Sequence, residues 1–122
     1  MAQLITLPTI RDSRGALSVI EKILPFEIKR VFYLYDITSQ RGGHAHHKTH
    51  LALIALGGQC QVTINSHGKI SDFFLSSPSE CLLLDPHDWH TMQDFSPNTT
   101  LLVLASEHYD PSDYIYEEPQ AQ

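Results

Sequence analysis

Ten residues near the middle of the chain constrain the fold most, because a Gly-Gly pair leads directly into a dense run of histidines. The segment is Arg41-Gly42-Gly43-His44-Ala45-His46-His47-Lys48-Thr49-His50, and it holds four of the eight histidines in the chain. On a β-strand, side chains alternate between faces, so every second residue from His44 to His50 is expected on one face, with neighbouring imidazoles roughly 6.6 Å apart. A helix would separate His44 from His46. The segment therefore predicts a strand whose polar face surrounds a metal ion or a small substrate.

Short strand-like runs recur along the 122 residues, and turn signals rich in Gly, Pro, Asn and Ser separate them. No helical period persists for three turns, so the pattern predicts an all-β fold, a sandwich or a barrel, as a single domain over 1–122. One helical turn begun by Ser112 or Asp113 and a frayed tail over 116–122 are expected at the end of the chain. The expected strands are 17–21, 30–37, 44–56, 61–65, 70–75, 81–84 and 101–106.

Composition excludes several classes of protein. The formal net charge of −6 argues against a nucleic-acid binder, since neutralising phosphates needs a basic surface. Two cysteines, Cys60 and Cys81, are too few for a disulfide framework and are expected to be buried reduced thiols. Neither a signal peptide nor a long apolar span is present, so we expect a cytoplasmic protein without a membrane partner.

The histidine cluster allows three interpretations. The spacing of His44, His46, His50 and Gly57 resembles the first motif of metal-binding cupins, with His90 as a fourth ligand. Metal-free acid–base chemistry is the second, because neutral imidazoles exchange protons near physiological pH. In the third, the histidines only line a polar barrel. Spacing alone does not decide among them.

Five blocks of sequence, in order and covering most of the chain, resemble the nucleotide-sugar 3,4-ketoisomerases. The resemblance implies a cupin, a jelly-roll-like antiparallel β-barrel that works without a metal or other cofactor on dTDP-4-keto-6-deoxyglucose. It further implies that His46 moves the proton between C3 and C4, that His44 relays a proton to and from the sugar oxygen, and that the protein is a homodimer with exchanged N-terminal strands. The blocks are 12–17, 29–36, 41–46, 89–96 and 102–110.

Five further residues are expected to bind substrate. Tyr35 and Arg41 are candidates for contacts to the sugar and its enolate, and a tyrosine pair on one face of a strand adds Tyr33. The planar fork of an arginine suits a diphosphate, a role open to Arg14 or Arg41. His90 is expected to line the pocket and to bias the pose of the sugar.

The predicted reaction shifts the keto group of a dTDP-linked 4-keto-6-deoxyhexose from C4 to C3 through an enediol, in the synthesis of deoxy and amino sugars for glycans. A serine before the Arg-Gly pair and a histidine after Trp89 resemble the members that form the 3-keto-6-deoxygalactose product. Two alternatives remain open. One is a cupin similar to sugar 3,5-epimerases, and the other is a non-catalytic cupin that binds a metal or a sugar nucleotide.

Overall fold

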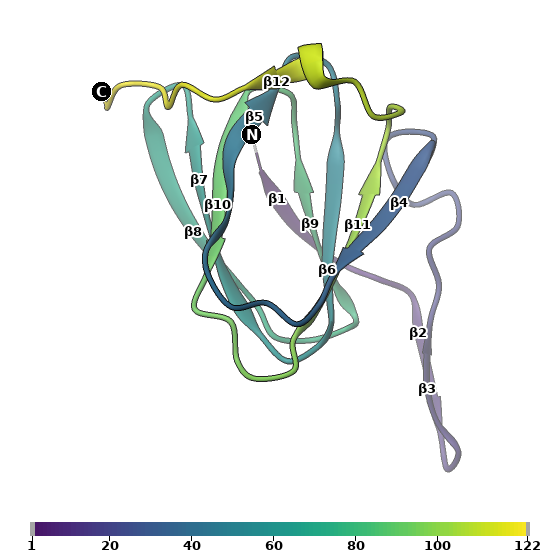
Figure 1. Ribbon diagram of the computed structural model, residues 1–122. Coiled ribbons are helices and arrows are strands. Elements are labelled where there is room, and N and C mark those ends of the chain that lie inside the picture. The colour runs from purple at the N-terminus through teal and green to yellow at the C-terminus, as the bar shows by residue number, and fades with distance from the viewer. Residues whose placement is uncertain (1, 122) are drawn as a thin grey trace.

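Two antiparallel sheets face each other and form the body of the molecule, as the computed structural model of residues 2–121 shows (Figure 1). The first sheet has the order β1 (Gln3–Thr6), β9 (Glu80–Leu84), β6 (Leu51–Gly57), β11 (Thr100–Ala105) and β4 (Arg30–Leu34). The second has the order β12 (Tyr114–Ile115), β5 (Arg41–His46), β10 (Asp88–Gln93), β7 (Cys60–Ser66) and β8 (Lys69–Leu75). The expectation of an all-β antiparallel fold is confirmed.

A separate hairpin leaves this body near the N-terminus. It consists of β2 (Thr9–Asp12) and β3 (Gly15–Ser18), which pair with each other and belong to neither large sheet. Figure 1 shows it extending away from the barrel. Its apolar side chains Ile10 and Leu17 are 65% and 57% exposed, an unusual exposure for large aliphatic residues in a chain of this size.

The core explains why the apolar run in β6 is continuous. One cluster fills the space between the sheets and includes Leu53, Val62 and Leu101. A second lies on the outer side of the first sheet, where Ile54 and Leu104 are covered by the apolar residues of segment 20–26. Because both faces of β6 are buried, both sets of its alternating side chains are hydrophobic.

The histidine segment does not form one strand with the apolar run that follows it, so the predicted strand 44–56 is wrong in its middle. β5 ends at His46 in the second sheet and β6 begins at Leu51 in the first, and residues 47–50 cross between the sheets. The crossing is possible because its backbone N–H groups find partners outside any strand ladder. Lys48 N donates to Asp113 Oδ1 and His50 N donates to Ser106 Oγ. Lys48 and His50 therefore do not share the face of His44 and His46.

The C-terminal segment lies across the end of the barrel (Figure 1). A 3₁₀ turn, η1 (Pro111–Asp113), precedes β12, and its N-cap is Asp110, whose side chain accepts a hydrogen bond from Ser112 N. The predicted turn is present, but it begins at Pro111 and not at Ser112 or Asp113, because proline fits the first position of such a turn. Farther on, Asn65 Nδ2 donates to Glu118 Oε2 and to Pro119 O. Residues 1 and 122, which the predicted domain and tail include, lie outside the described residues.

No helix within residues 2–121 is long and apolar enough to cross a membrane.

Candidate active site

Two neighbouring strands bring three histidines together inside the barrel. His44 and His46 lie on β5, and His90 lies on β10 directly opposite His44. The strands approach closely because β5 has no side chain at Gly42, where a Cβ would stand 2.7 Å from the carbonyl oxygen of His90. Gly42 also has a φ of +84°, a left-handed conformation that favours glycine. The Gly-Gly pair therefore lets β5 lie against β10 just before the histidines.

The histidines border a cavity of about 170 Å³ between the two sheets. The rings of His44 and His46 lie 5.3 Å apart, and the rings of His44 and His90 lie 5.0 Å apart. Tyr114 on β12 covers both β5 histidines, at 4.9 Å from His44 and 4.5 Å from His46. The lining residues are Phe32, Leu34, Arg41, Gly42, His44, His46, Leu51, Leu53, His90, Met92, Val103 and Tyr114.

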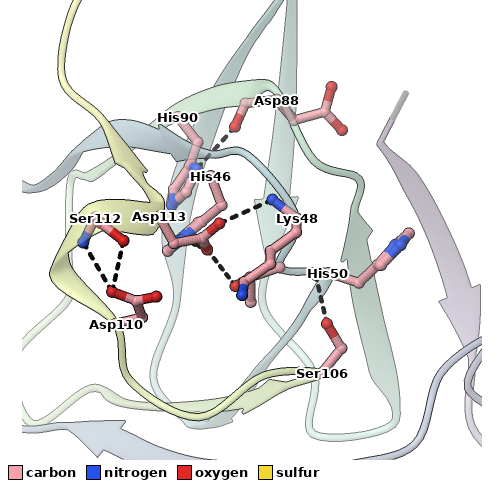
Figure 2. A network of polar contacts seen from close by, with 10 residues as sticks. His46, Lys48, His50, Asp88, His90, Ser106, Asp110, Ser112 and Asp113 are labelled. Carbon is pink, nitrogen blue, oxygen red and sulfur yellow. Dashed lines mark hydrogen bonds and ion pairs between the residues drawn. The ribbon is translucent and has the colours of Figure 1, made fainter.

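Asp113 holds His46 from the side of the C-terminal segment (Figure 2). The distance from His46 Nδ1 to Asp113 Oδ2 is 3.0 Å, and both side chains are buried. Thr49 Oγ1 donates to the same carboxylate oxygen, and Lys48 N donates to Oδ1 at 2.9 Å. Since the carboxylate accepts all three hydrogen bonds, it fixes the proton of neutral His46 on Nδ1 and leaves the lone pair on Nε2.

The environment keeps the three imidazoles neutral. Burial and the neighbouring His46 lower the pKa of His44 to about 4, and burial lowers the pKa of His90 to about 3. Burial also lowers the pKa of His46, although the hydrogen bond and the charge of Asp113 oppose the shift. Burial would raise the pKa of Asp113, but its hydrogen bonds from Thr49, Lys48 and His46 outweigh burial and lower it. At neutral pH the site therefore holds a carboxylate and three neutral imidazoles.

A second hydrogen bond fixes His90. Its Nδ1 donates to the carbonyl oxygen of Asp88 at 3.0 Å, so Nε2 carries the lone pair of the neutral ring. The ring lies 6.5 Å from that of His46 and nearly parallel to it. His90 therefore forms a rigid neutral wall of the cavity.

The structure brings four of the seven predicted site residues together at the cavity: His44, His46, His90 and Arg41. Tyr33 and Tyr35 lie on the opposite, exposed face of their segment, with ring centroids 5.7 Å apart. They border a shallow hollow of about 260 Å³ that Arg41 also lines, so Arg41 connects this hollow with the inner cavity. Arg14 lies in the turn of the β2–β3 hairpin, where Arg14 Nη2 contacts Asp12 Oδ2 at 2.6 Å.

Sequence reasoning missed Asp113 and Tyr114 as part of the site. Both are more than 60 positions from His46 in sequence, and the short β12 pairs Tyr114 with His46. A signal was present, since Tyr114 and Tyr116 alternate as on a strand, which places them on one face. Asp113 carried no signal, because only the crossing at 47–50 creates the donors that it satisfies.

Among residues 2–121, no group of three or more His, Cys, Asp or Glu side chains is arranged so that it could hold a metal ion.

A two-sheet antiparallel barrel with histidines on its inner wall defines a cupin-like protein with a histidine-lined cavity. The family model described as FdtA: WxcM-like, C-terminal matches residues 1–120, and the chain belongs to this family.

The chain is also similar to characterised relatives over nearly its whole length. It is 43% identical over 117 residues to a TDP-4-oxo-6-deoxy-α-D-glucose-3,4-oxoisomerase of Aneurinibacillus thermoaerophilus, covering 93% of this chain and 84% of the relative. The QdtA 3,4-ketoisomerase of Thermoanaerobacterium thermosaccharolyticum in complex with TDP has a TM-score of 0.91 and 40% identity, over 95% of this chain and 88% of that chain. A double variant of QdtA with TDP has a TM-score of 0.91 and 42% identity, over 95% and 87% of the two chains. The predicted membership of the ketoisomerase family is confirmed.

Proposed function

We propose that this chain converts a dTDP-linked 4-keto-6-deoxyhexose to its 3-keto isomer by histidine-mediated proton transfer through an enediol. The observation that carries the proposal is the pair of neutral histidines on one cavity wall, one of which is oriented by a buried carboxylate. The 43% identity to a TDP-4-oxo-6-deoxy-α-D-glucose-3,4-oxoisomerase supports the choice of substrate.

His46 is the group that moves the carbon-bound proton. Its Nδ1 is engaged by Asp113, so the lone pair on Nε2 is available to take the proton from C3 of the sugar. The imidazolium that forms is stabilised by the Asp113 carboxylate, as in a serine–histidine–aspartate triad. Returning the same proton to C4 completes the shift. One such general acid–base group contributes about 10²–10⁴ in rate.

His44 transfers the proton between the oxygens at C3 and C4 of the sugar. Moving the keto group requires a proton to leave the hydroxyl at C3 and another to reach the oxygen at C4, in the same direction as the carbon-bound proton, which moves from C3 to C4. The His44 ring lies 5.3 Å from that of His46 on the same wall, and burial keeps its pKa at about 4. A neutral imidazole can accept the proton from the C3 hydroxyl and donate a proton to the C4 oxygen. His44 therefore provides the transfer between the oxygens, and His46 provides the transfer between the carbons.

The cavity is large enough for only one part of the substrate. Its volume of about 170 Å³ lies below the roughly 300–1,000 Å³ typical of pockets that bury whole ligands, which favours the sugar inside and the nucleotide outside. Arg41 lies between the inner cavity and the outer hollow, where its planar fork suits the diphosphate. Tyr33 and Tyr35 border the hollow and are our candidates for contacts to the nucleoside.

The product is proposed to have the galacto configuration at C4. His90 forms a fixed wall of the cavity, and a change of sugar pose worth about 2.7 kcal/mol would favour one face a hundredfold. In the QdtA double variant, arginine replaces a tyrosine and histidine replaces an arginine, and identity to this chain rises from 40% to 42%. This rise supports placing Arg14 and His90 at those two positions, since two matches in 122 residues are worth about 1.6 percentage points.

Assembly as a homodimer with exchanged N-terminal strands is also part of the proposal. The β2–β3 hairpin exposes Ile10 and Leu17 and pairs with no other strand of residues 2–121, which favours burial against a second copy. We place the protein in the cytoplasm, in keeping with two buried free cysteines, Cys60 and Cys81.

A ¹H NMR assay with dTDP-4-keto-6-deoxyglucose in D₂O tests the reaction. The proposal predicts a 3-keto product, retention of the proton at C5 and a small coupling between H4 and H5. Deuterium at both C3 and C5 without a 3-keto product would favour the 3,5-epimerase alternative. Unchanged substrate would favour the non-catalytic cupin, and a large coupling between H4 and H5 would overturn the galacto assignment.

A further inference from the structure

The inner face of β4 carries a cation that the mechanism above does not use. Arg30, Phe32 and Leu34 alternate with the exposed residues Val31 and Tyr33, and Phe32 and Leu34 line the cavity. By this alternation Arg30 lies on the inward face of the strand, next to the cavity and not among the residues that line it. The strand register pairs Arg30 with Ala105, next to the segment that crosses between the sheets at 47–50. Arg30 therefore lies at the end of the barrel where β5 finishes with His46.

One donor of the Arg30 guanidinium, the buried Nε, lacks a hydrogen-bond partner within residues 2–121. The guanidinium lies over two aromatic rings, at 5.3 Å from the centre of Phe32 and 5.7 Å from that of Tyr109. Stacking stabilises the faces of the guanidinium but supplies no acceptor for an in-plane N–H group such as Nε–H. Arg30 Nε is buried without a hydrogen-bond partner, and no Asp or Glu of residues 2–121 forms an ion pair with Arg30. A buried, unpartnered donor on an arginine indicates a place for a negatively charged ligand atom.

The positive charge of Arg30 affects the pKa of His46. The titratable and charged groups around His46 are Asp113 from η1, Tyr114 from β12, His44 from its own strand, His90 from β10 and Arg30 from β4. Burial is the main cause that lowers the pKa of His46. The positive charge of Arg30 also lowers this pKa, by a smaller amount, and Asp113 opposes both effects. Among these groups, Arg30 is the one that stays positively charged at every physiological pH.

We propose that Arg30 supplies the positive charge that stabilises the enediolate formed beside His46, an inference that rests on the proposed ketoisomerase reaction. When His46 takes the proton from C3, the C–H electron pair forms the C3–C4 double bond and the C4 carbonyl becomes an alkoxide. The new negative charge then forms in a site that already holds the carboxylate of Asp113. With Arg30 present, Arg30 and imidazolium balance Asp113 and the alkoxide. Without Arg30, the buried site keeps a net negative charge throughout the reaction.

The position of Arg41 separates this role from binding of the diphosphate. Arg41 and His46 are the two ends of β5, five residues or roughly 16 Å apart, and Arg41 borders the outer hollow. The diphosphate is therefore assigned to the Arg41 end, and the sugar oxygens to the Arg30 end.

Arg30→Met and Arg30→Lys test the proposal, with Lys69→Met on the distant strand β8 as the control for loss of a surface cation. We expect Arg30→Met to lower kcat at least about 10-fold while the Kd for TDP changes less than about twofold, because only the transition-state charge is affected. The acid limb of the kcat/KM profile should move to higher pH in Arg30→Met, and Arg30→Lys should restore both properties in part. If Arg30→Met does not fold, Arg30→Gln takes its place.

Two results would overturn the inference. One is an Arg30→Met enzyme with wild-type kcat and an unshifted pH profile. The other is a loss of TDP affinity as large as the loss in kcat/KM, which would place Arg30 at the diphosphate. An inactive wild-type protein would refute the proposed function itself, so the two failures are distinguishable.

Discussion

Replacing Asp113 by asparagine should disable His46 without removing it. The carboxylate accepts hydrogen bonds from His46, Thr49 and Lys48, whereas an asparagine side chain must turn its NH₂ group toward at least one of these donors. A hydrogen bond to a charged group is worth about 1.5–3 kcal/mol, which corresponds to roughly 10- to 150-fold in rate. Loss of the correct histidine tautomer adds to this, and the equivalent change in a serine-protease triad lowers kcat by about 10⁴.

We therefore expect Asp113→Asn to lower kcat by between about 10² and about 10⁴, measured by ¹H NMR on the nucleotide sugar. Asp113 raises the pKa of His46, so loss of its charge should lower that pKa. The acid limb of the kcat/KM profile should therefore move to lower pH in Asp113→Asn. Asp110→Asn is the matched control, because Asp110 caps the same turn, is not buried, and within residues 2–121 its side chain accepts hydrogen bonds only from Ser112. An Asp113→Asn enzyme with kcat like that of the control would refute the reasoning.

Three further predictions concern the whole protein. Because burial lowers the pKa of His44 to about 4 and of His90 to about 3, the unfolded chain binds protons below pH 6.5 that the folded chain does not. The free energy of unfolding in urea should thus fall by about 2 kcal/mol per histidine between pH 7 and pH 5, and an unchanged value would contradict the neutral site. Turnover should survive exhaustive chelation, since imidazoles supply the base; a stoichiometric metal whose removal abolishes turnover would exclude this mechanism. Light scattering should give a homodimer at micromolar concentration, and a monomer would argue against exchange of the hairpin.

The sequence predicted the class of fold because its strands carry strong local signals. The apolar run of β6 and the Asn-Ser-His-Gly turn before β8 are examples, and each signal depends only on residues that are close in sequence. β10 was missed, because its inward residues His90 and Met92 alternate with polar ones and follow a Pro-containing turn. The break at 47–50 was missed for another reason: its backbone donors are satisfied by Asp113 and Ser106, which are distant in sequence.

The same distinction applies to the site. His44 and His46 could be placed on one face by strand periodicity, and His90 and Arg41 also lie at the cavity. Asp113 could not be foreseen, since the contact with His46 depends on how the C-terminal segment crosses the barrel. Strand alternation correctly predicted that Tyr33 and Tyr35 share one face. Alternation alone could not tell whether that face points into the barrel or to the outside.

Comparison of His46→Asn with His47→Asn tests the central claim most directly. His46 is buried beside Asp113, whereas its neighbour His47 is exposed and its ring lies against His87. We expect His46→Asn to bind TDP as the wild type does but to have a kcat lower by at least about 10², and His47→Asn to keep its activity. Normal turnover by a folded His46→Asn enzyme would contradict the assignment of the carbon-bound proton to His46.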